Sequence, residues 1–124
     1  MLPQEHHVAV LGATPKQGRY ANQVLILLKE ANYKVTPIHP KFTEIENLAV
    51  TNNISQINAP VQTLTLYVGP ERLLSMIQDI VNLKPTRVIF NPGTESKPLQ
   101  EALSKANIEW FEACTLVMLK TKVF

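Results

Sequence analysis

The stretch that decides the fold is Val8-Ala9-Val10-Leu11-Gly12-Ala13-Thr14-Pro15-Lys16-Gln17-Gly18-Arg19. Its first four residues form a continuous apolar run, which is typical of a strand covered on both faces in a parallel sheet. Gly12 follows where the chain must turn tightly, and a helical pattern begins at about Tyr20. A strand, a tight loop and a helix N-terminus aim free N–H groups and a positive dipole end at one point. The stretch therefore predicts a seat for a phosphate group.

Strands and helices alternate along the rest of the chain. The predicted strands cover residues 7–11, 33–38, 62–68, 87–90 and 108–111, with apolar residues at helical spacing between them. This alternation predicts an α/β fold, a doubly wound and mostly parallel five-stranded sheet of the Rossmann-like, three-layer kind. A chain of 124 residues is expected to form one domain, residues 1–124. Ligands of such sheets bind at the carboxyl ends of the strands, where the strand order reverses.

Local signals refine this outline. Asn32 is expected to end the first helix in the left-handed conformation, and Gly69-Pro70-Glu71 is a strong helix start. Because Pro37 has no N–H to donate, strand pairing is expected to fail near it. Residues 42–60 are rich in turn formers and are expected to form a loop with one short helical turn near residues 55–58. The apolar segment 115–119 has no clear type.

Composition excludes several classes of function. The net charge is +2 without any run of Lys or Arg, which argues against nucleic acid as a partner. The apolar run 24–28 is far too short to cross a bilayer, and residues 1–7 lack the pattern of a signal peptide. The single Cys114 cannot form an internal disulfide and has no metal-ligand spacing around it. These features predict a cytoplasmic protein without a metal site.

Two familiar phosphate-binding motifs do not fit the loop. A dinucleotide fingerprint needs a second glycine where Thr14 stands, and the chain has a basic Lys41 after the second strand instead of an acid. A P-loop needs a closer pair of glycines than Gly12 and Gly18. What remains is a loop that surrounds a diphosphate with the Thr14 hydroxyl, Lys16, the Gly18 amide and Arg19. A basic residue such as Lys41 suits an extra ribose phosphate, which NADP and coenzyme A both carry.

Five motifs, spread in order over nearly the whole chain, resemble the stand-alone CoA-binding-domain proteins. The fold of that family is similar to the CoA-binding domain of the succinyl-CoA synthetase alpha subunit. Two positions depart from the family pattern: His39 stands where Asn is usual, and Gln62-Thr63 replaces an Asp often found before the third strand. The motifs are VAVLGATP at residues 8–15, YKVTPIHPK at 33–41, YVGP at 67–70, NPGTE at 91–95 and ACTL at 113–116.

The resemblance implies a ligand and a set of contacts. The ligand is coenzyme A or an acyl-CoA, whose diphosphate would face the first loop and whose adenosine phosphates would face the motif after the second strand. The loop after the third strand would line the adenine side. Carried onto this sequence, the implied contacts are Gly12, Ala13, Thr14 and Arg19, then Pro40 and Lys41, then Val68, Gly69 and Pro70.

Two further residues stay open between structural and functional roles. Asn91 can contact the ligand, although turn formation explains it equally well. Cys114 is expected to be a small buried residue, and the sharper alternative is a mixed disulfide with the CoA thiol. No residues are spaced like a catalytic triad or a Cys–His pair, so no catalytic residue is assigned.

The sequence therefore leaves three hypotheses for function. The first is non-catalytic binding of CoA or acyl-CoA, with a homodimer or an acyl-transfer protein as possible partners. The second is a fragment of an NADP-dependent oxidoreductase, because NADP shares the extra ribose phosphate. The third is a protein-interaction scaffold whose nucleotide site has decayed.

Overall fold

A computed structural model describes all residues from Met1 to Phe124 and contains a five-stranded sheet. The strands lie in the order β2-β1-β5-β6-β7, and every neighbouring pair is parallel. The doubly wound parallel sheet predicted from the alternation of strands and helices is confirmed. The strands are β1 (His7–Leu11), β2 (Lys34–Ile38), β5 (Thr63–Leu66), β6 (Arg87–Phe90) and β7 (Glu109–Glu112).

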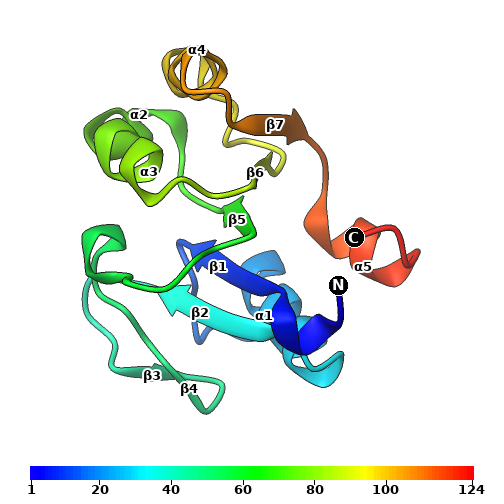
Figure 1. The fold of residues 1–124 in the computed structure, drawn as a ribbon. Coiled ribbons are helices and arrows are strands. Elements are labelled where there is room, and N and C mark those ends of the chain that lie inside the picture. The colour runs from blue at the N-terminus through cyan, green and yellow to red at the C-terminus, as the bar shows by residue number, and fades with distance from the viewer.

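Helices cover both faces of the sheet and complete three layers (Figure 1). Helices α1 (Tyr20–Glu30) and α5 (Thr115–Lys120) lie together on one face. The other face carries α3 (Ile77–Leu83) and α4 (Lys97–Lys105), which contact each other. The helix expected after Gly69-Pro70 is divided into α2 (Pro70–Leu73), the 3₁₀ turn η3 (Leu74–Met76) and α3. The segment of unclear type at residues 115–119 is α5.

Alternation along β1 supplies both halves of the core. Ala9 and Leu11 belong to the apolar cluster beneath α3 and α4, whereas Val8 and Val10 belong to the cluster beneath α1 and α5. All five residues of β1 are buried, which is why the strand reads as an unbroken apolar run rather than an alternating one. Both clusters together fix β1 between the two helical layers.

Pairing does not fail at Pro37, contrary to the expectation from sequence. The ladder between β1 and β2 continues through Pro37 to Ile38. Successive residues of a strand point their N–H groups to opposite sides, and the nitrogen of Pro37 faces away from β1. Its carbonyl, on that same outer side, accepts a hydrogen bond from the Thr51 amide at 3.0 Å. The missing donor therefore lies on the edge of the sheet, where proline is tolerated.

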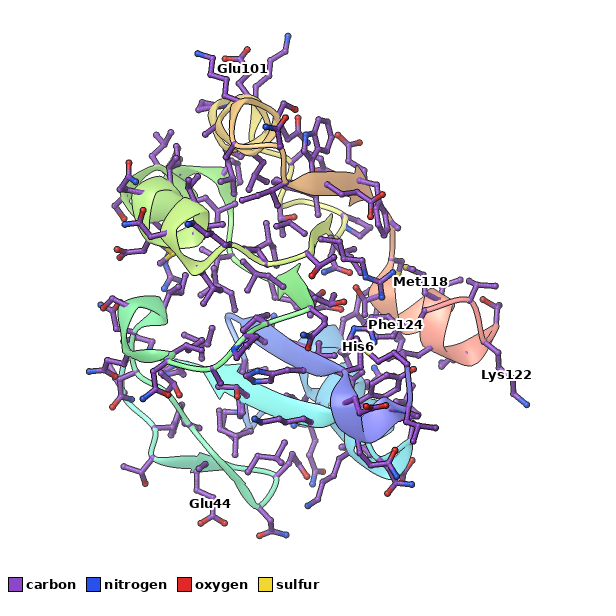
Figure 2. All side chains as sticks on the ribbon, viewed as in Figure 1. His6, Glu44, Glu101, Met118, Lys122 and Phe124 are labelled. Atoms are coloured by element: carbon purple, nitrogen blue, oxygen red, sulfur yellow. The ribbon has the colours of Figure 1, made fainter.

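The region 42–60 contains a hairpin that the sequence prediction missed. Strands β3 (Glu44–Ile45) and β4 (Leu48–Ala49) pair antiparallel, and the turn residues Glu46 and Asn47 both have positive φ. Glu44 points away from the body of the molecule (Figure 2). The single short helical turn is confirmed as the 3₁₀ helix η2 (Ile54–Gln56), close to the expected residues.

The two ends of the chain meet on the side of α5. The ring of Phe124 stacks on His6 at 5.5 Å between centroids, and Tyr33 meets both rings edge-on. The Arg87 guanidinium lies 4.6 Å from the centroid of Phe124. Figure 2 labels His6 and Phe124 side by side next to the last helix. No helix combines the length and apolar character needed to span a membrane.

Candidate functional site

The reversal of strand order places the first loop beside the exit of β5. From β1 the chain moves outward to β2 and then returns past β1 to β5, so the loops after β1 and β5 are neighbours at the carboxyl edge. The contact is close at Gly12, whose φ is +88°. A Cβ built there would lie 2.6 Å from the Tyr67 carbonyl oxygen. Only glycine fits this position, as the turn signal in the sequence predicted.

The loop and the start of α1 present free amides. Arg19 is the N-cap of α1, and its side chain does not cap the helix. The amides of Tyr20, Ala21 and Asn22 make no hydrogen bond within the protein, as expected for an uncapped first turn. The loop amides of Thr14, Gln17 and Gly18 are also without partners. The amides of Gly12 and Ala13 are not available, because both donate to the Ile38 carbonyl at 3.2 Å.

Hydrogen bonds tie the loop after β1 to helix α1 and to the β3–β4 hairpin. The Thr14 hydroxyl accepts the Lys16 amide at 3.1 Å, which tightens the turn. Asn22 is buried, and its Nδ2 donates to the Thr14 carbonyl at 3.1 Å and to Oε2 of Glu46 at 2.9 Å. The loop is thereby tied to α1 and to the hairpin, while its amides at Thr14, Gln17 and Gly18 keep no partner.

Two cavities open along this edge and share Gly12, Thr14 and Tyr67. The first has a volume of about 520 Å³ and lies over the start of α1. Two cations and no carboxylate line it, so its potential is positive. The second has a volume of about 440 Å³ and lies between the loop after β2, η2 and the segment α2–α3. The lining of the first is Gly12, Thr14, Lys16, Gly18, Arg19, Tyr20, Ala21 and Tyr67.

The structure brings most of the expected binding residues together and leaves others outside. Lys41 is exposed and lines neither cavity. Gly69 and Pro70 lie at the start of α2 and also line neither. The expected residues that line one or both cavities are Gly12, Ala13, Thr14, Lys16, Arg19, Pro40 and Val68.

The sequence agrees with this geometry, because residues 6–120 match the family model described as a CoA binding domain. The chain belongs to the CoA-binding domain family. The resemblance drawn from the five motifs is confirmed. A switch-point loop with free amides next to a positive cavity is thus found in a CoA-binding domain.

Solved and curated proteins are similar to this CoA-binding domain. A crystal structure of an uncharacterized protein is 41% identical, covers 96% of this chain and 98% of its own, and superposes with a TM-score of 0.88. The uncharacterized protein YneT of Bacillus subtilis is 18% identical over 81 residues, which span 65% of this chain and 60% of YneT. The acetyl-coenzyme A synthetase 1 of Ca. Korarchaeum cryptofilum, solved with phosphate and ADP, is 18% identical with a TM-score of 0.74. That match covers 90% of this chain and 27% of the synthetase, and it shows a common fold.

Asn91 holds the CoA-binding domain together behind the site. It is buried, and its Nδ2 donates to the Thr65 hydroxyl at 2.7 Å and to the Leu66 carbonyl at 2.8 Å. Its Oδ1 accepts the Thr115 amide at 2.8 Å. Every polar atom of the side chain is therefore used within the protein, and Asn91 lines neither cavity. These internal hydrogen bonds give Asn91 a structural role, and it needs no ligand contact to account for it.

The cavity walls also contain titratable residues that were not singled out from the sequence, among them Tyr67, Arg72 and Asp79. Tyr67 lines both cavities, burial raises its pKa above the usual value, and its buried hydroxyl has no hydrogen-bond partner. Arg72 and Asp79 line the second cavity. A usable signal existed for Arg72, because it lies in the first turn after the third predicted strand and so belongs to the carboxyl edge. Asp79 gave no such signal, since its position depends on how α3 packs.

Proposed function

We propose that this chain binds coenzyme A or an acyl-CoA, with the diphosphate seated over the first loop and the start of α1. The observation that carries the proposal is the group of unpartnered amides at Thr14, Gln17, Gly18 and the first turn of α1, in a segment whose residues line a cavity together with Lys16 and Arg19. Free amides at a helix N-terminus attract phosphate oxygens, and the two cations add to the same field.

The shape of the edge supports an extended ligand. The cavities meet at Gly12 and Thr14, so a molecule can occupy both while its middle passes over the loop. Coenzyme A has this form, with a nucleotide at one end, a diphosphate in the middle and a pantetheine arm at the other. The acetyl-coenzyme A synthetase that shares the fold supports the same class of ligand by its name.

We further propose that binding, not turnover, is the role of the chain. Two cations, two tyrosines and the turn-forming Thr14 are the polar residues that line the first cavity, and these groups hold an anion without attacking it. No nucleophile with an adjacent base lines that cavity. The domain would then present or sequester its coenzyme for another protein.

Calorimetric titration with CoA, acetyl-CoA and NADP tests the binding proposal. We expect CoA and acetyl-CoA to bind at one site per chain and NADP to bind at least tenfold more weakly. Arg19→Gln should weaken CoA binding about tenfold, as expected for losing a charge-assisted hydrogen bond. Lys97→Gln is the matched control, since Lys97 is an exposed cation at the start of α4, and it should change nothing.

A second assay separates binding from turnover. Incubating the protein with acetyl-CoA and measuring free thiol should show no release above the rate in buffer. Release that saturates with acetyl-CoA would make the chain a thioesterase. Tighter binding of NADP than of CoA would instead favour an oxidoreductase.

A further inference from the structure

The side chain of Glu46 joins the β3–β4 hairpin to the loop after β1, although it lines neither cavity. Glu46 is half-buried, and its Oε2 accepts a hydrogen bond at 2.9 Å from Nδ2 of Asn22, the third residue of α1. The same nitrogen donates its second proton to the Thr14 carbonyl at 3.1 Å. Because Asn22 is buried, both protons of its amide group depend on these two acceptors. A carboxylate of the hairpin thereby reaches the backbone of the loop through one side chain.

The hairpin is anchored firmly enough to support that loop. Ile45 is buried in the apolar cluster beneath α1 and α5, and Leu48 and Val50 pack against the same cluster. Near the end of α1, Nζ of Lys29 donates to the Glu46 carbonyl at 2.7 Å. The backbone of Glu46 is therefore tied to α1, and its side chain starts from a fixed position.

The turn of the hairpin disfavours a glutamate at position 46. Ile45 pairs with Leu48, which leaves Glu46 and Asn47 as the two turn residues, with φ of +52° and +61°. Two left-handed residues in such a turn are preferably glycine, asparagine or aspartate. Asn47 fits this preference and Glu46 does not. The strained position indicates that the longer side chain of Glu46 serves something other than the turn.

Asn22 holds the start of the loop that the proposed diphosphate would contact. Residues 15–19 are exposed, and Pro15 has no N–H with which to hold the backbone. At the far end of the loop, Nε2 of Gln23 donates to the Gly18 carbonyl at 3.0 Å. Two adjacent amide side chains of α1 therefore hold the two ends of the segment that carries the unpartnered amides.

We propose that Glu46 is a positioning residue for coenzyme binding, which acts through Asn22 without contacting the ligand. This inference rests on the proposed function. Its effect has the opposite sign to that of charge alone, because a carboxylate repels an anion and its removal would then strengthen binding. A positioning role predicts weaker binding whenever the hydrogen bond to Asn22 is lost, since a loop that is ordered in advance costs less to order on binding.

Two variants remove the same charge and differ in the hydrogen bond. Glu46→Gln keeps an acceptor oxygen at the same reach, so CoA affinity measured by calorimetry on the whole chain should stay within twofold of wild type. Glu46→Asn is one methylene too short to reach Asn22, so the affinity should fall about fivefold, as expected for one lost hydrogen bond.

A thermal melt separates positioning from stability. The melting temperature of Glu46→Asn should stay close to that of wild type, because asparagine adopts the left-handed conformation more readily than glutamate. The matched control is Glu44→Gln, which changes an exposed carboxylate of the same hairpin that points away from the body of the molecule (Figure 2). This control should alter neither the affinity nor the melting temperature.

Amide NMR of the free protein gives a readout that needs no ligand. The resonances of Gln17 and Gly18 should shift or broaden in Glu46→Asn and match wild type in Glu46→Gln. Equal CoA affinities of the two Glu46 variants would overturn the positioning role and leave the proposed function standing. If wild type does not bind CoA, the proposed function fails and the positioning role fails with it, even where NMR shows that Glu46 orders the loop.

Discussion

Two loops at the same edge of the sheet differ in their polar side chains and in how the helix that follows each of them begins. The loop from Gly12 to Arg19 follows β1 and starts α1, and the loop from Asn91 to Ser96 follows β6 and starts α4. The first leaves amides without partners and has no side-chain cap. The second is closed, because Ser96 caps α4 and Asn91 uses its whole side chain internally. We call them the open loop and the closed loop.

Side chains of the closed loop make most of their hydrogen bonds within the protein. The Thr94 hydroxyl donates to the Asn91 carbonyl at 2.7 Å, and Glu95 Oε1 accepts the Gly93 amide at 3.0 Å. The Ser96 hydroxyl accepts the Leu99 amide at 3.3 Å. A position at the carboxyl edge is therefore not enough to make a binding loop. What separates the two is the start of the helix and the charge beside it: Ser96 caps α4, whereas α1 has no side-chain cap and begins beside a cavity lined by two cations.

The largest expected effect comes from a side chain at the base of the open loop. Gly12→Ala places a Cβ against the Tyr67 carbonyl and forces a residue with a side chain to adopt a φ of +88°. We expect the free energy of unfolding to fall by about 3 kcal/mol and CoA affinity to fall more than a hundredfold, because the open loop must move away from the segment that follows β5. Urea denaturation and calorimetry measure the two quantities.

Gly18→Ala is the matched control within the same loop. Gly18 has a φ of +86°, but a Cβ there would have nothing within 4 Å. Backbone strain alone should lower the free energy of unfolding by about 1 kcal/mol. Equal losses of unfolding free energy in the two variants would show that the close approach of Gly12 to the Tyr67 carbonyl is unimportant.

The next largest effect is expected for Asn91→Ala, which should lower the free energy of unfolding without changing CoA affinity. Asn91→Ala leaves the Leu66 carbonyl and the Thr115 amide without their partner in the buried centre of the closed loop. The free energy of unfolding should fall by about 2–3 kcal/mol, while the folded protein binds CoA as before. Asn82→Ala, at an exposed asparagine that accepts one hydrogen bond from Gln78, should change neither quantity. A large loss of affinity in Asn91→Ala at a temperature where it is folded would contradict this division.

Ionic strength should affect the open loop and the closed loop differently, and this can be measured without a mutation. Raising ionic strength from about 0.05 M to 0.5 M should weaken CoA binding about tenfold, because Lys16 and Arg19 are exposed and attract a screened anion. The melting temperature of the free protein should change little, since the buried hydrogen bonds that Asn91 makes in the closed loop join neutral groups. The double variant Lys16→Gln/Arg19→Gln should flatten the dependence of affinity on salt. A slope that survives in the double variant would place the diphosphate elsewhere.

The smallest effect concerns the proton that the His39 imidazole binds. Burial, Lys41 and Arg72 lower the pKa of His39 below 6.5, so the folded protein binds this proton more weakly than the unfolded chain. Its contribution to stability is therefore present above pH 6.5 and is lost as the pH falls through that value toward the folded pKa. An NMR titration should find a midpoint below 6.5 in the free protein and a higher midpoint with CoA, whose phosphates offset the two cations. A midpoint of 6.5 or above without ligand would contradict the geometry around His39.

The elements that sequence predicted best are those whose signals are local. The unbroken apolar run of β1 gave its bounds, and Arg87–Phe90 was found as β6 for the same reason. Gly12 was predicted as a turn, and the left-handed Asn32 was predicted as a helix end and has a φ of 67°. Each of these depends on residues adjacent in the chain.

What sequence missed depends on partners that are distant in the chain. The hairpin of β3 and β4 has strands of two residues each, too short for any period to show. The role of Asn91 needs Thr65 and Thr115, which only the finished sheet brings together. The loss of the Gly12 and Ala13 amides to Ile38 likewise needs β2 in place. The availability of a polar group is a tertiary property, and the motif alone does not contain it.

The outward-facing nitrogen of Pro37 also bears on how the molecule meets its neighbours. An edge strand with free N–H groups is a template on which another chain can add a strand and start an aggregate. Here β2 is such an edge, but Pro37 has no N–H to donate. The Thr51 amide already donates to the Pro37 carbonyl, and the His39 amide donates to the Thr51 carbonyl. The opposite edge, β7, ends in the exposed carboxylates of Glu109 and Glu112. Both borders of the sheet therefore resist extension, and a second copy of the chain would have to dock through helices and loops.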